Sequence, residues 1–230
     1  MVSELTADMH ARVAEAIRAE ESRTSGEIFC VMARRVSTYR DIALGYAAAA
    51  ALILPLALIP LGFEPAWIPG MGDSWQGAHL ASADVAVGQT LAAYALVQAT
   101  IFLIVLLVAS IPAVSGRVTP RAIRRERVRE AALQQFLAHG LHVTKARTGV
   151  LIFAALADHQ VEVIADEGIH SRVDQAVWAE AVEVLTRGLK RGDPASGFID
   201  AVALCGGVLA EHFPPAPRNA NEIEDKLVVI

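Results

Sequence analysis

Residues 42–63 read IALGYAAAAALILPLALIPLGF, and residues 91–111 read LAAYALVQATIFLIVLLVASI. Neither stretch contains Lys, Arg, Asp, Glu or His. Each is about 20 residues long, which at about 1.5 Å per residue spans a hydrocarbon core of about 30 Å. A charge at such a centre costs roughly 2.5–3.5 kcal/mol, so its absence favours two membrane helices over two buried core helices. Since no ionisable side chain lies in either stretch, we expect no ion or proton site inside the bilayer.

Positive charge is distributed unevenly around this predicted hairpin. The connecting loop, residues 64–84, contains acidic residues but no Lys or Arg. Arginines lie on the outer flanks, at Arg34, Arg35 and Arg40 before the hairpin and in a group of six after it. The positive-inside rule therefore predicts an integral protein of the cytoplasmic (inner) membrane, with both termini in the cytoplasm and the loop outside.

The six arginines that follow the hairpin are candidates for a membrane-surface site. They are Arg117, Arg121, Arg124, Arg125, Arg127 and Arg129. A basic residue near an anionic bilayer contributes about 1 kcal/mol of attraction, so we expect contact with anionic lipid headgroups. The alternative is that these arginines only set the topology.

Composition narrows the classes of function. The chain has 230 residues and a formal net charge of −5, and its mean hydropathy is +0.41. An acidic balance, with the basic residues beside the membrane, argues against nucleic acid as a partner. Two cysteines do not make a disulfide framework, and a cytoplasmic location predicts free thiols.

Outside the hairpin, the pattern alternates between helices and strands. Residues 6–21 and 120–138 have the apolar spacing of amphipathic helices, and residues 26–33 read as a buried strand. Residues 150–157 and 161–165 predict a β-hairpin around a turn at 158–160. Two further helices are expected at 174–190 and 195–212. The tail from Pro214 reads as a loose linker that ends in a small apolar hook at Leu227–Ile230.

The strand at 26–33 has no partner nearby in the sequence. Two-stranded pairs are marginally stable, so this strand needs the later strands as neighbours. We therefore predict one cytoplasmic domain split by the hairpin. Its expected parts are 1–40 and 115–213, with the membrane hairpin at 41–114 and a tail at 214–230.

Three motifs give this chain a family resemblance. Residues 23–28 read RTSGEI, residues 147–170 read RTGVLIFAALADHQVEVIADEGIH, and residues 192–198 read GDPASGF. Their order resembles the TPM-domain family, also called the TPM phosphatase domain, and in particular its membrane-embedded branch. The resemblance covers about 21–40 and 140–213.

The resemblance implies an α/β fold, an α/β/α sandwich split by an inserted two-helix transmembrane hairpin. It also implies one of three roles found among relatives. These are calcium binding, weak acid-phosphatase activity, and the assembly or repair of membrane complexes.

Four side chains at the end of the second predicted hairpin strand could ligate a metal ion. They are Glu162, Asp166, Glu167 and His170. Carboxylates at such a place suit Ca²⁺ or another divalent cation. The alternative is an exposed acidic loop that caps the following helix.

Two arginines precede Thr and a nearby Gly at predicted strand starts. Arg23 and Arg147 are therefore candidates for anion binding, and the alternative is a turn with solvated arginines. The chain contains no P-loop, no GxGxxG and no zinc-ligand spacing.

Two hypotheses for function follow. The first is a non-catalytic, membrane-anchored module that binds or assembles membrane-protein partners at the cytoplasmic face. The alternative is a divalent-metal-dependent phosphatase. A phosphatase needs a nucleophile or an activated water, and the sequence offers metal-ligand candidates without a clear nucleophile. It leaves open whether the protein is an enzyme.

Overall fold

The computed structural model describes residues 7–58, 83–144, 146–170, 172–215 and 221–230. These residues belong to two compact units. The first unit combines Met1–Ser37 with Arg121–Ile230, and the second is Thr38–Pro120. The predicted loop between the apolar stretches lies largely outside the described residues.

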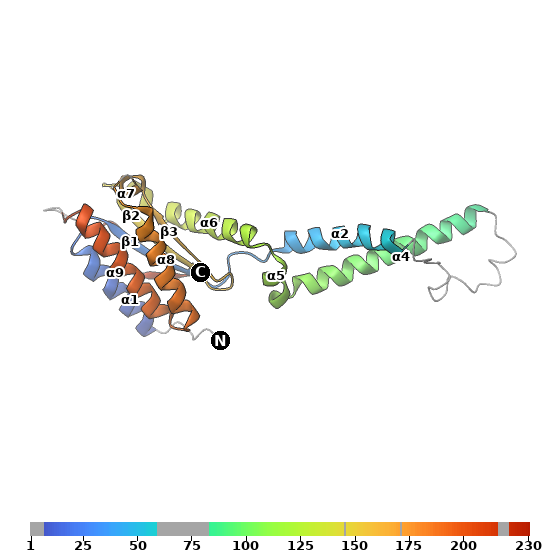
Figure 1. The fold of residues 1–230 in the computed structure, drawn as a ribbon, viewed down its shortest axis with the longest axis horizontal. Helices are drawn as coiled ribbons and strands as arrows, with labels where there is room; N and C mark the ends of the chain where they lie inside the picture. The colour runs from blue at the N-terminus through green and yellow to red at the C-terminus, as the bar shows by residue number, and fades with distance from the viewer. Residues whose placement is uncertain (1–6, 59–82, 145, 171, 216–220) are drawn as a thin grey trace. The chain divides into compact units, whose positions relative to one another are not determined.

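The first unit contains a mixed four-stranded sheet in the order β3-β2-β1-β4 (Figure 1). The strands are β1 (Glu27–Ala33), β2 (Gly149–Ala155), β3 (Gln160–Ala165) and β4 (Leu227–Val229). β1 is parallel to β2 and to β4, whereas β2 and β3 are antiparallel.

β1 and β2 form the centre of this sheet. Their register runs from Glu27 opposite Gly149 to Ala33 opposite Ala155, and every residue of both strands is buried. Strands covered on both faces read as continuous apolar runs, as these do. The segments before and after the apolar hairpin therefore share one sheet, as the lone strand in the first segment required.

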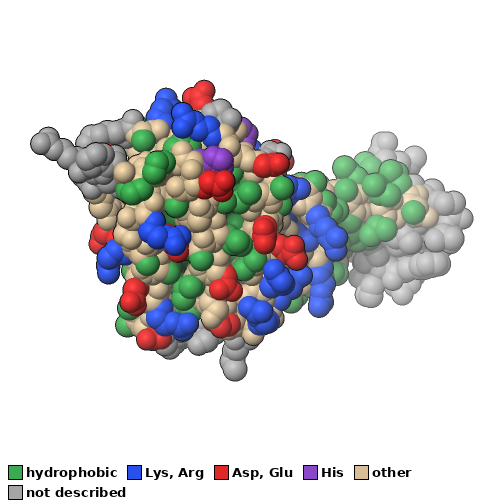
Figure 2. All heavy atoms as spheres, turned by 60° about the vertical axis from the view of Figure 1, so that its left-hand side comes forward, with side chains coloured by type: hydrophobic (Ala, Val, Ile, Leu, Met, Phe, Trp, Pro, Cys, Tyr) green, Lys and Arg blue, Asp and Glu red, His purple; other side chains and the backbone are tan. Residues whose placement is uncertain are grey.

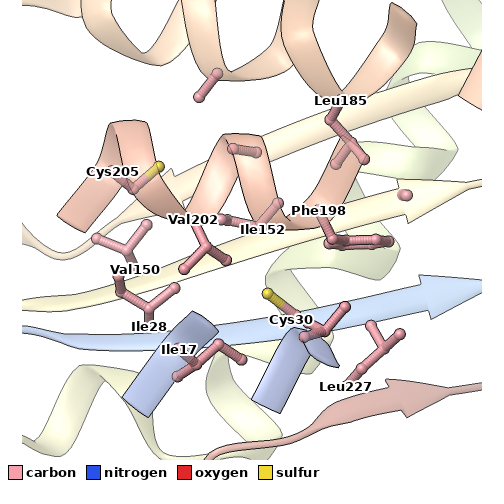
Figure 3. Packing of buried hydrophobic residues seen from close by; sticks show 14 of the residues in the cluster. Ile17, Ile28, Cys30, Val150, Ile152, Leu185, Phe198, Val202, Cys205 and Leu227 are labelled. Carbon is pink, nitrogen blue, oxygen red and sulfur yellow. The ribbon is translucent and has the colours of Figure 1, made fainter. Parts of the chain in front are cut away.

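One face of the sheet is covered by α1 (Ala7–Glu21), α8 (Gln175–Lys190) and α9 (Pro194–His212). Figure 3 shows Phe198 and Val202 of α9 and Ile17 of α1 pointing towards the same strands. Each of the three side chains is fully buried. The amphipathic patterns of these helices therefore predicted the side that faces the sheet.

α6 (Arg121–Ala138) covers the opposite face of the sheet. Its buried side chains Val128, Ala132 and Phe136 recur every four residues and belong to the same apolar cluster as Phe29 and Phe153. A short 3₁₀ helix, η3 (Leu141–Val143), follows α6. Helices thus cover both faces of the sheet, which confirms an α/β fold.

The apolar hook predicted at Leu227–Ile230 is part of the sheet in the structure. β4 pairs with β1, and the chain beyond it is held by hydrogen bonds in both directions. Ile230 donates its N–H to Met32 O at 3.0 Å, and Arg34 donates its N–H to Ile230 O at 2.8 Å. Leu227 is only 3% exposed. The apolar end of the tail is therefore an edge strand of the sheet.

The segment after β3 also differs from the expected loop. Glu167–His170 form a short helix, α7, which buries Ile169. The buried isoleucine fixes this turn against the core, which an acidic loop pattern did not indicate.

The second unit consists of α2 (Arg40–Leu58), α4 (Ala83–Ser110) and α5 (Pro112–Val118). α2 and α4 pack against each other along an alanine stripe. On α2, Ala43, Ala47 and Ala51 are buried at four-residue spacing, and Ala93 is buried on α4. Small residues at this spacing let the two helices approach closely.

The outward surface of this helix pair is apolar. Large hydrophobic side chains that are about half or more exposed include Leu52, Ile53, Leu56, Leu91, Leu103, Ile104 and Leu107. Figure 2 shows hydrophobic side chains gathered over the described part of this unit. On the visible face of the sheet unit, basic and acidic side chains are interspersed.

Three described helices are long and apolar enough to cross a membrane: α2, α4 and α9. α9 differs from the other two because 50% of its apolar window is buried, against 22% for α2 and 6% for α4. The apolar residues of α9 are thus accounted for by the core beneath it.

Candidate functional site

Asp166, directly after β3, is a predicted metal ligand, and it forms an ion pair with Arg147, a predicted anion-binding residue. Its Oδ1 accepts the N–H of Glu167 at 2.7 Å. Its Oδ2 lies 3.6 Å from Nε of Arg147. Asp166 is only 5% exposed, so this ion pair fixes the carboxylate within the turn.

Glu162, in the middle of β3, faces α6. Its Oε1 lies 3.9 Å from Nε of Arg125. Burial raises the pKa of Glu162, and the charges of Arg125 and Arg129 act in the opposite direction. This carboxylate therefore also has an arginine as its neighbour.

The remaining predicted metal ligands lie on α7. Glu167 and His170 are both exposed. Within the part of the chain that the structure describes, no three His, Cys, Asp or Glu side chains are grouped to hold a metal ion. Glu162 and Asp166 each lie beside an arginine instead. The metal assignment stays a sequence-based prediction.

Arg23 is also beside a carboxylate. Its Nη2 lies 2.6 Å from Oε2 of Glu20, one helical turn earlier. The structure does not bring Arg23 and Arg147 together through any contact it records, and anion binding by them stays a prediction.

The threonines next to these arginines have a structural role. Thr148 donates its hydroxyl to Ser25 O at 3.1 Å, and Glu27 donates its N–H to Thr148 O at 3.2 Å. Thr24 donates its hydroxyl to Phe213 O at 2.7 Å. The two Arg-Thr turns thus fix the starts of neighbouring parallel strands and the end of α9.

The predicted membrane-surface arginines are divided between the units. Arg117 is exposed on α5, in the helical unit. The other five lie on α6, where Arg121, Arg125 and Arg129 are exposed. Arg124 and Arg127 are partly buried.

Two of these exposed arginines border a hollow at the outer edge of the sheet. The hollow has a volume of about 530 Å³ and lies between α6, β3 and α8. It is lined by Arg121, Ala122, Arg125, Gln160, Val161, Glu162 and Val182. We call this hollow the β3 groove. Two arginines against one half-buried carboxylate give its lining a positive excess, which suits an anionic group.

Comparison with known proteins agrees with this architecture. Residues 104–208 match the family model of the TPM domain. The chain contains a TPM domain. The match begins within α4 and ends within α9, and β1 and β4 complete the sheet from outside the matched residues.

A solved structure shares the fold of this TPM domain protein. It is the NMR structure of BA42 protein from the psychrophilic bacterium Bizionia argentinensis. The likeness has a TM-score of 0.56 at 17% sequence identity, and it covers 99% of this chain and 97% of that chain. At this identity the likeness concerns the fold alone. A search of curated proteins found no match.

The first unit also contains a buried acidic group that the sequence pattern did not reveal. Glu21 Oε1 accepts the N–H of Ile28 at 2.7 Å. Burial, with a further contribution from a hydrogen bond to Asp225, raises the pKa of Glu21 to about 9. Asp225 also lies 3.4 Å from Arg18.

Glu27 extends this acidic group at the start of β1. It is 4% exposed, and burial raises its pKa. Its Oε1 accepts the N–H of Glu222 at 3.3 Å. A glutamate at the start of an otherwise apolar strand was the available signal. Its partners come from the C-terminal segment, which the pattern had indicated as loose.

Proposed function

We propose that this protein is a membrane-anchored TPM-domain module that binds membrane-protein partners at the cytoplasmic face without catalysing a reaction. The observation that supports this function best is the surface of the α2–α4 pair. Its large apolar side chains are exposed, as with Leu52 at 61% and Leu91 at 64%. Exposed apolar patches of this kind suit contact with lipid or with other proteins.

The interior of the helix pair supports the same proposal. Lipid tails supply no hydrophobic drive for helix association, so membrane helices rely on close packing of small residues. The buried stripe of Ala43, Ala47 and Ala51 has this property. The polar pattern of a soluble helix pair is absent from the apolar stretch of α2.

Binding is favoured over catalysis by the state of the charged side chains. Asp166 and Arg147 neutralise each other, as do Arg23 and Glu20. Glu162, the metal-ligand candidate on β3, lies beside Arg125, and a metal-dependent phosphatase would need Asp166 and Glu162 free for Ca²⁺ or another divalent cation. In contrast, Arg121 is exposed at the β3 groove and accessible to a partner.

The first arm of the test examines the anchor. Membranes from cells that express the full chain are washed with alkaline carbonate, which removes peripheral proteins. We expect the chain to stay in the membrane pellet, and a reporter fused after Ile230 to read cytoplasmic. Release into the wash, or an external reporter signal, would contradict the proposed anchor or its orientation.

The second arm examines catalysis. The purified chain in detergent is assayed for hydrolysis of p-nitrophenyl phosphate with Ca²⁺, with Mg²⁺ and with EDTA. We expect no metal-dependent hydrolysis above the rate of a Glu162→Gln, Asp166→Asn double variant. A rate that rises with metal and disappears in the double variant would establish the phosphatase alternative.

A further inference from the structure

The outer edge of β3 carries backbone groups that no other described strand pairs. Among the described strands, β3 is the end of the sheet and pairs only with β2. Asp166 donates its N–H to Gly149 O at 2.9 Å, which identifies this position as a hydrogen-bonded pair. Hydrogen-bonded positions alternate in an antiparallel ladder, so Glu162 and Ile164 face β2 with their backbone groups. The N–H and C=O of Val161 and Val163 therefore point outward.

The first half of this edge, Gln160, Val161 and Glu162, lines the β3 groove, and the two walls of the groove differ in chemistry. On one side, α6 contributes Arg121 and Arg125. On the other side, α8 contributes Val182. The side chains of β3 alternate in the same way, with Glu162 towards α6 and Val161 in the apolar cluster beneath α8.

We propose that the β3 groove binds an extended segment of a partner protein, which adds to β3 as a further strand and alternates acidic with apolar side chains. Exposed strand edges recruit such segments through main-chain hydrogen bonds, and alternate side chains then determine specificity. Successive residues of a strand point to opposite faces. One set would face Arg121 and Arg125, and the other would face Val182.

The positive charge of the α6 wall predicts that the side chains of the first set are acidic. The side chain of Arg125 is 75% exposed, and its Nε lies 3.9 Å from the carboxylate of Glu162. At that distance the contact is longer than a charge-assisted hydrogen bond of about 2.7–2.9 Å, so the guanidinium keeps donors for a second carboxylate. Arg121 is exposed on the same wall, one helical turn earlier.

This inference rests on the proposed binding function and names the chemistry of the partner. Its test uses the full chain in nanodiscs of neutral phosphatidylcholine and a fluorescent peptide of sequence EVEVEVE. We expect the peptide to bind, and a KVKVKVK peptide to bind at least about tenfold more weakly, a difference of about 1.4 kcal/mol. An Arg121→Glu, Arg125→Glu double variant should reverse this preference.

Peptide methylation tests main-chain pairing without changing the protein. In an extended EVEVEVE peptide, all glutamate amides point to one side and all valine amides to the other. N-methylation of one set should abolish binding, whereas N-methylation of the other set should leave it within about threefold. Equal effects of the two sets would overturn strand addition.

A matched pair of protein variants adds an independent measurement. Val163→Pro removes one outward N–H, and because this N–H points away from β2, the β2–β3 hydrogen bonds remain. Proline is tolerated on edge strands at such positions. We expect Val163→Pro to weaken peptide binding by about tenfold, and Val163→Ala, which keeps the N–H, to change it by less than about threefold. If Val163→Pro fails to fold, the methylated peptides decide the question.

The remaining outcomes separate this inference from the proposed function. Binding of phosphatidylserine vesicles with no binding of either peptide would assign the arginines to lipid and overturn strand addition. A chain that resists carbonate extraction but binds neither peptide keeps its membrane role and loses this partner. A chain that is extracted yet binds the acidic peptide keeps strand addition and loses its anchor.

Discussion

The environment of a single carboxyl group in this domain, and so its pKa, depends strongly on its position relative to the core. Glu21 ends α1, where the sequence shows an ordinary charged helix terminus. In the folded chain it is desolvated, and the N–H of Ile28 and the carboxyl of Asp225 hold it in place. Glu15, on the same helix, is exposed. The same residue type therefore makes two different contributions to the stability of the domain.

Glu21 predicts a pH dependence of stability. Its pKa is raised from 4.5 to about 9, so the folded state holds the proton more tightly than the unfolded state. The contribution to stability is complete below pH 4.5. It falls as pH rises towards 9, by at most about 1.4 kcal/mol per pH unit. We expect Glu21→Gln to flatten this decline.

The measurement is urea unfolding in detergent micelles between pH 5 and pH 9, followed by circular dichroism. Glu15→Gln serves as the control and should keep the slope of the parent chain. A slope for Glu21→Gln equal to that of the parent would show that Glu21 ionises at an ordinary pH in the folded protein.

At the scale of the element, the sequence predicted those helices and strands whose apolar pattern is long or strongly periodic. The β2–β3 hairpin has a clear turn at Asp158-His159, and α9 buries Phe198 and Leu209 at the expected spacing. β4 was missed because three apolar residues after a polar segment give too short a pattern. Its position depends on the edge of β1, which only the folded sheet presents.

The candidate site was less predictable than the fold. The acidic residues in and after β3 were recognised by type, but the arginines beside them are set by tertiary structure. Arg125 reaches Glu162 because α6 packs across β3. Arg147 has a positive φ of 52°, which places it in the turn beside Asp166. No spacing rule in one sequence gives either pairing.

The α2–α4 interface predicts a size limit at Ala47, which is fully buried. Ala47→Leu adds three carbon atoms where the two helices approach closely, and overpacking of this kind costs about 1–3 kcal/mol. Ala49→Leu is the matched control because Ala49 is exposed. The midpoint of SDS-induced unfolding should fall for Ala47→Leu and stay near the parent value for Ala49→Leu. Equal midpoints would contradict the observed packing.

At the scale of the whole molecule, one sheet is built from segments that come before and after the apolar helix pair in the sequence. β1 lies between β2 and β4 and pairs with both. Removal of the first segment would therefore leave β4 without a neighbouring strand and expose one edge of β2. The helix cover from α1 would be lost as well.

This arrangement predicts complementation between fragments. A fragment of residues 121–230 should show no cooperative thermal unfolding, and addition of a peptide of residues 1–37 should restore it. The same peptide with Ile28→Asp should fail, because an unpaired charge in the core costs several kcal/mol. Cooperative unfolding of the isolated 121–230 fragment, with a midpoint unchanged by the peptide, would contradict the shared sheet.

The central position of β1 also has a consequence during translation. β1 ends at Ala33, whereas β2 begins only at Gly149. At about 5–20 residues per second, the ribosome needs about 6–23 s to make the chain between them. During this interval, α2 and α4 are synthesised while β1, which is apolar after Glu27, has no neighbouring strand. We therefore expect β1 to need cover during translation, from α1 or from a chaperone, until its partner strands exist.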